Sequence, residues 1–176
     1  MAISQPIKNI EVIKKIKEYY KQKNMLQDLL LFELGINTGA NLKDLLQLRI
    51  KDIKNKSYIA FDGDKVFPVS SEIQNIISKI ADNKDPSEFL FQNKSGNRIN
   101  RSVVFTSFKE ICSELGLPKD ISVASWRKTF AFHHYKKYRD LSYLQWLFNQ
   151  TTVKITLKFI GVYENMNLRY REGVLL

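Results

Sequence analysis

Hydrophobic residues recur at helical spacing along most of the chain. The isoleucines at 10, 13 and 16 and the tyrosine at 20 share one face of a helix that is predicted to begin near Asn9. A second helix is predicted from about Met25 to Leu34, where Gly35, Thr38 and Gly39 interrupt the pattern. Because this second segment is the more apolar of the two, we expect it to be the core helix.

Capping and turn residues divide the rest of the chain into shorter elements. Asn41 is placed to cap a helix that runs to about Leu48, with Asp44 as its capping-box partner. The segments 57–61 and 65–69 flank Asp62-Gly63-Asp64, which is typical of a hairpin turn. Ser71 and Gln74 form a second predicted capping box, which opens a helix to about Ile80. Further helices are predicted over residues 100–115, 123–137, 141–148 and 153–162. The sequence therefore predicts a mainly α fold with one small β-hairpin (α+β).

The length of 176 residues and a hydrophobic content of 44% suit one domain with its own core. Residues 1–8 are polar and contain proline, so we expect a poorly ordered start. The predicted domain then covers residues 9–162, and residues 163–176 form a tail without clear periodicity.

The chain is strongly basic, with 28 Lys and Arg against 18 Asp and Glu, a net charge of +10 and a pI near 9.6. This balance favours a polyanionic partner such as nucleic acid, although a solvated lysine-rich surface would give the same numbers. The single cysteine, Cys112, excludes an internal disulfide and falls in the apolar register of a helix. Without a signal-peptide pattern or a membrane-length apolar run, the sequence predicts a cytoplasmic protein with no membrane partner.

Four segments carry a resemblance when they are taken in order: LGINTGANLKDLL from Leu34, FPV from Phe67, ASWRKTFA from Ala124 and FIGV from Phe159. Their layout resembles the catalytic domain of tyrosine recombinases, the phage integrase family, over about residues 7–162. The resemblance implies that fold and a chemistry in which a tyrosine hydroxyl attacks a DNA phosphodiester. Two arginines and a histidine or tryptophan then bind the non-bridging oxygens, and a hairpin lysine protonates the leaving oxygen.

Few of the catalytic residues implied by this resemblance are present. Arg127 matches the second arginine, and Lys65 is the best match to the hairpin lysine. The positions of the first arginine, of two histidine-type donors and of the nucleophile are occupied by Asn41, Ala124, Asn149 and Phe159. Phenylalanine has no hydroxyl, and loss of one preorganised donor typically costs about 100-fold to 1,000-fold in rate. The resemblance thus implies a domain deficient in strand cleavage.

Three functions remain open from the sequence. The preferred hypothesis is a cleavage-deficient domain that binds duplex DNA phosphates through Arg127, Lys128 and Lys65, as a repressor, an accessory factor or a mobile-element remnant. The second is an active site-specific recombinase with a displaced nucleophile, Tyr163. The third is a protein-interaction module that forms homo-oligomers through the apolar end of its tail, Val174-Leu175-Leu176. Arg127 and Lys65 could also be a surface ion-pair donor and an exposed turn lysine that bind no DNA.

No cofactor is implied by the sequence, and the neighbouring pair His133 and His134 offers too few ligands for a metal ion. Trp126 and Trp146 occupy apolar positions, so we expect both in the core rather than on a base-stacking surface. Members of the family usually carry a separate N-terminal DNA-binding domain. We therefore expect this chain, as a short form or a fragment, to bind DNA weakly and with strong salt dependence.

Overall fold

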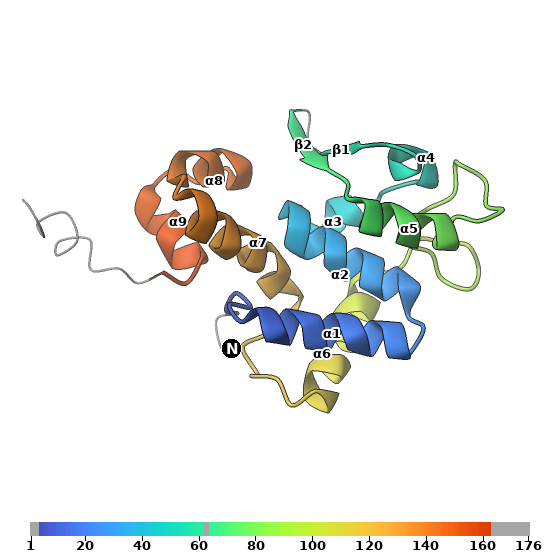
Figure 1. Cartoon of the computed structure of the whole chain (residues 1–176), viewed down its shortest axis with the longest axis horizontal. Helices are drawn as coiled ribbons and strands as arrows, with labels where there is room; N and C mark the ends of the chain where they lie inside the picture. The colour runs from blue at the N-terminus through green and yellow to red at the C-terminus, as the bar shows by residue number, and fades with distance from the viewer. Residues whose placement is uncertain (1–3, 62–63, 163–176) are drawn as a thin grey trace, which may run out of the picture.

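The computed structural model describes residues 4–61 and 64–162 (Figure 1). This part of the chain is mainly helical with one two-stranded sheet, as predicted. The helices are α1 (Ile10–Gln22), α2 (Leu26–Thr38), α3 (Leu42–Leu45), α4 (Ile50–Ile53), α5 (Ser71–Ile80), α6 (Arg101–Glu114), α7 (Val123–Tyr138), α8 (Leu141–Phe148) and α9 (Val153–Phe159), and the strands are β1 (Tyr58–Phe61) and β2 (Lys65–Pro68). The short helix α4 was not predicted from the sequence.

Helix α2 is the centre of the core and packs against α1, α5 and α7. It continues through Gly35 and ends at Thr38, where Gly39 caps it with a left-handed φ of 66°, so the predicted end at Leu34 is wrong. A Cβ on Gly35 would lie 2.7 Å from Cε3 of Trp126. Gly35 therefore serves close packing between α2 and α7, which is a tertiary requirement that periodicity does not reveal.

The segment that leads into α1 is packed rather than loose. Ile7 is 2% exposed, and its backbone N–H donates to the Thr129 hydroxyl over 2.8 Å. The Gln5 N–H donates to the carbonyl of Asp120, and the Lys8 ammonium donates to the carbonyl of Gly161. Residues 5–8, for which the sequence predicts poor order, thus contact α7 and the segment before it through Ile7 and Gln5.

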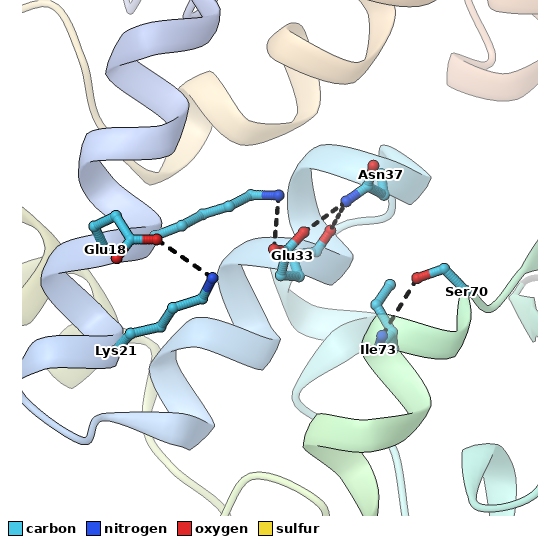
Figure 2. Close-up of polar contacts among 7 residues, drawn as sticks. Glu18, Lys21, Glu33, Asn37, Ser70 and Ile73 are labelled. Carbon is cyan, nitrogen blue, oxygen red and sulfur yellow. Dashed lines mark hydrogen bonds and ion pairs between the residues drawn. The ribbon is translucent and has the colours of Figure 1, made fainter.

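One charged side chain lies inside the core. Glu33 on α2 is 3% exposed, and its carboxylate lies 2.7 Å from the Lys17 ammonium of α1. The Asn37 amide, one turn further along α2, donates to the same carboxylate over 3.0 Å (Figure 2). A buried carboxylate needs such partners, because desolvation without them is costly. This polar group joins α1 to α2.

The hairpin projects from the side of the fold that carries α3, α4 and α5 (Figure 1). Its strands pair antiparallel with Ile59 opposite Phe67, and both of these side chains are buried. Helix α5 follows, and Ser70 rather than the predicted Ser71 caps it by accepting from the Ile73 N–H (Figure 2).

The two tryptophans have different environments. Trp126 is 3% exposed and packs edge-on against Phe32 and Phe108, as predicted for a core residue. Trp146 is 47% exposed, so the prediction that it is a core residue is wrong. It lies on the outer face of α8, whose inner face carries buried Leu144 and Leu147.

Cys112 is buried, as predicted. None of the helices in the described ranges is long and apolar enough to cross a membrane.

Candidate nucleic-acid interface

Arg127 is a half-buried arginine in the second turn of α7, and the chain holds its guanidinium in a fixed orientation. Its Nε donates to the carbonyl of Gly39 over 2.7 Å, and Nη1 donates to Oδ1 of Asn41 over 2.6 Å. The group also lies 4.8 Å from the ring centroid of Phe148. A guanidinium has five N–H donors in a planar fork, so these contacts leave donors to bind an oxyanion.

Asn41 does not cap α3 through its side chain, which corrects the sequence-based prediction. Its amide oxygen accepts from Arg127, while its amide nitrogen donates to Asp44 over 3.1 Å. An amide offers an acceptor and donors at once, so it bridges the cation and the carboxylate. Where the resemblance implies a first arginine, this chain thus has a neutral residue that orients the second one.

Burial lowers the pKa of the Arg127 guanidinium, and the Asp44 carboxylate opposes that shift. The guanidinium stays charged at neutral pH, because the ordinary pKa of arginine lies far above neutral pH. Burial also lowers the pKa of Lys128, the next residue of α7. The Lys128 ammonium donates to the carbonyl of Ser4 over 2.6 Å and lies 5.6 Å from the ring centroid of Phe159. Contacts within the protein therefore already use part of the capacity of the Lys128 ammonium to bind an anion.

Lys65 reaches from the start of β2 to the end of α8. Its ammonium donates to Oδ1 of Asn149 over 3.3 Å and lies 5.9 Å from the ring centroid of Trp146. Asn149 is the residue after α8 and has a left-handed φ of 53°. A hollow of about 20 Å³ between these elements is lined by Lys65, Arg127 and Asn41, among others. The hairpin lysine and the arginine of α7 therefore face the same space.

A larger recess of about 220 Å³ adjoins this hollow. Its lining brings together, from three separate segments, residues that the sequence had singled out: Asn41, Ala124, Arg127, Lys128 and Phe159. Ala124 contributes only a methyl group, and the Phe159 ring packs 5.0 Å from that of Phe148. Asn149 does not line the recess, but its amide oxygen accepts a hydrogen bond from Lys65, which lines the adjoining hollow. Tyr163 and the apolar tail lie outside the described residues.

Three residues that the structure draws attention to were not singled out in the sequence. Arg101 lines the recess from the first turn of α6, and its place directly after the cap Asn100 was the available signal. Tyr58, an exposed tyrosine, lines a neighbouring cavity of about 650 Å³ together with Asn41 and Asp44. Gln150 buries Oε1 without a hydrogen-bond partner in the described ranges, and nothing in the sequence marked it.

The two histidines line neither the hollow nor the recess. His133 makes a 3.0 Å hydrogen bond with the carbonyl of Ile7, and His134 stacks on Tyr143. Burial lowers the pKa of His134, with Asp140 opposing the shift. No group of three metal-ligating side chains is found in residues 4–61 and 64–162.

Comparison with known proteins identifies the class. Residues 8–165 match the phage integrase family. The chain is 31% identical over 172 residues to the probable integrase/recombinase YoeC of Bacillus subtilis, covering 94% of this chain and 93% of that protein. It is 28% identical over 142 residues to the tyrosine recombinase XerD of Corynebacterium glutamicum, covering 74% of this chain and 47% of that one.

A solved structure agrees in fold. The XerH site-specific recombinase bound to its difH substrate superposes with a TM-score of 0.71 at 19% identity, covering 99% of this chain and 55% of XerH. The chain thus spans about half the length of these XerD and XerH relatives, and nearly all of YoeC. It belongs to the phage integrase family, the tyrosine recombinases.

Proposed function

We propose that the chain binds duplex DNA by its phosphates and does not cleave the strand. The observation that carries the proposal is the arrangement of Arg127, whose guanidinium is fixed by Gly39 and Asn41. A preorganised arginine loses little freedom when it binds a phosphate oxygen. Lys65 and Arg101 supply further positive charge at the adjoining hollow and recess. The related XerH, bound to its difH substrate, supports DNA as the polyanion.

The other side chains that line the recess do not supply the groups that strand cleavage requires. Phe159 has no hydroxyl, Ala124 has no donor and Asn41 has no charge, and all three line the recess around Arg127. Each missing donor to a developing oxyanion typically lowers the rate about 100-fold to 1,000-fold, although such effects need not add. Among the described residues, the lining of the recess keeps the means to bind a phosphate but contains no nucleophile to break the bond. Such a domain is suited to act as a repressor or an accessory factor.

The test combines binding with covalent trapping. Labelled duplex DNA is titrated with the protein from 50 to 200 mM salt, and a nicked suicide substrate is then denatured to reveal any protein–DNA adduct. We expect a salt-sensitive complex, no adduct, and weaker binding by Arg127→Ala. A matched control is Lys14→Ala, because Lys14 is an exposed cation on α1 that pairs with Glu11, away from the recess.

Each result has one meaning. No complex at 50 mM salt would overturn DNA binding. An adduct would overturn the cleavage-deficient part, and Tyr163→Phe and Tyr58→Phe would then identify the nucleophile.

The interaction-module alternative is tested separately by removing residues 163–176. An unchanged oligomeric state would dispose of it.

A further inference from the structure

The recess beside Arg127 is lined mainly by apolar side chains. Its walls combine aromatic and aliphatic residues from α3, α6, α7 and α9: Phe105, Phe159, Trp126, Leu42, Leu45 and Val123. Ala124 adds only a methyl group, and Gly35 adds no side chain. An apolar ring that enters this space exchanges water for contact with these walls, which is favourable in proportion to the area that it buries.

The size of the recess suits one aromatic ring. Its volume is about 220 Å³. An engineered apolar cavity of about 150 Å³ takes up benzene, whereas pockets for larger ligands usually measure about 300–1,000 Å³. Phe105 is 40% exposed and Phe159 is half-buried, so a bound ring can pack against aromatic as well as aliphatic walls. The recess therefore fits a single substituted ring rather than a larger ligand.

The charged groups of the lining favour an anion. The hydrogen bonds of Arg127 leave part of its five-donor fork unused, and Arg101 lines the recess from the first turn of α6. Among the described residues, no carboxylate belongs to this lining. Asp44, which Asn41 links to Arg127, lies outside it. An anionic ligand is therefore attracted to the recess and not repelled by its walls.

The lining also contains a buried hydrogen-bond donor without a partner. Trp126 is 3% exposed, and its Nε1 meets no acceptor within the described residues. Buried donors in proteins are almost always paired, so an unpaired donor in the wall of a cavity indicates a bound partner with an acceptor atom. The recess thus combines apolar walls for a ring with donors for an oxygen-bearing group.

We infer that the recess binds a small aromatic carboxylate, whose anion pairs with Arg127 and whose ring packs against the apolar walls. A carboxylate fits better than a phosphate monoester, which carries a charge of about −1.5 to −2, because desolvation beside apolar walls costs more for the higher charge. The inference rests on the proposed function, since it adds a regulator to the same site. A bound carboxylate occupies the guanidinium that a DNA phosphate uses, so it lowers the affinity for duplex DNA.

The test titrates the full chain with benzoate at constant ionic strength in an isothermal titration calorimeter. Acetate has the charge without the ring, and benzyl alcohol has the ring without the charge, so these two compounds are the ligand controls. We expect saturable binding of benzoate that is at least about tenfold tighter than binding of either control, because only benzoate uses both the guanidinium and the apolar walls.

Variants locate the site. Phe105→Ala removes an exposed wall of the recess and should weaken benzoate binding about tenfold, and Arg127→Ala should weaken it at least as much. The matched control is Val103→Ala, because Val103 is 57% exposed on the same helix and does not line the recess, so benzoate binding should be unchanged. An unchanged far-ultraviolet circular dichroism spectrum checks the fold of each variant.

Competition with DNA is measured by fluorescence anisotropy of a labelled 30-base-pair duplex, with benzoate or acetate at equal ionic strength. Benzoate at ten times its own Kd should raise the apparent Kd for the duplex about tenfold, and acetate should leave it unchanged.

Three results would each refute the inference: benzoate binding no tighter than the ligand controls, Phe105→Ala binding benzoate as tightly as the wild type, or an unchanged duplex affinity in saturating benzoate. Duplex binding without benzoate decides the proposed function separately. A wild-type protein that binds no duplex refutes the proposed function, and the competition with it.

Discussion

Gly35→Ala tests the packing that positions Arg127. An alanine inside a helix is favoured over glycine by about 0.8–1.0 kcal/mol, so α2 alone would be stabilised. The new Cβ, however, would lie 2.7 Å from Cε3 and 3.2 Å from Cβ of Trp126. The indole cannot turn aside, because the rings of Phe32 and Phe108 lie edge-on to it with centroids 5.6 and 5.0 Å away.

Overpacking of such a site typically costs about 1–3 kcal/mol, which exceeds the gain in helix propensity. We expect a net loss of about 1 kcal/mol in the free energy of unfolding. For a chain of this length that lowers Tm by roughly 2–4 °C. Thermal unfolding followed by circular dichroism measures the change, and urea titration confirms it independently.

A double-mutant cycle isolates the clash. Trp126→Phe removes the benzo ring that meets the new methyl group, so Gly35→Ala should be less harmful in that background than in the wild type. Gly116→Ala is a comparison with a different cause, because Gly116 has a φ of 63° but open space around it. If Gly35→Ala raised Tm, the argument for close contact between α2 and α7 would be refuted.

Three further predictions follow from contacts described above. Arg127→Lys should weaken duplex binding roughly tenfold in a fluorescence anisotropy titration, because an ammonium cannot contact Gly39, Asn41 and a phosphate together. An unchanged affinity would contradict this prediction. Lys17→Met should lower the free energy of unfolding by about 3–5 kcal/mol in urea by leaving Glu33 buried without its cation, whereas Lys17→Met/Glu33→Leu should regain most of that stability. Burial raises the pKa of Cys112 to about 11, so the thiol should resist alkylation at pH 8 in the folded protein. The same thiol should react fast in urea. Rapid reaction of the folded form would refute its burial.

Local sequence signals predicted most of the helices and the hairpin, because their hydrophobic spacing and caps lie within a few residues of each element. They failed where a distant partner decides the outcome. Gly35 has the pattern of a helix break, but Trp126 explains it as a packing residue. Asn41 has the position of a cap, but its amide oxygen is taken by Arg127. Trp146 fits the apolar register of α8, yet α8 packs only one face, so the ring stays exposed.

The candidate site was predictable only in part. Family resemblance singled out Arg127 and Lys65, and the structure places both around one hollow. Their contacts with Asn41 and Asn149 depend on how α7, α8 and the hairpin approach one another, which no local pattern encodes.

The separation of these partners along the chain affects how the protein is made. Arg127 contacts residues 86 and 88 positions earlier, and Lys65 contacts a residue 84 positions later. Contacts of such high sequence separation close large loops, and chains dominated by them fold more slowly. A nascent chain therefore carries its positive charge long before the proposed phosphate site is organised. On the proposed function, selective binding would begin only when the last helices have emerged from the ribosome.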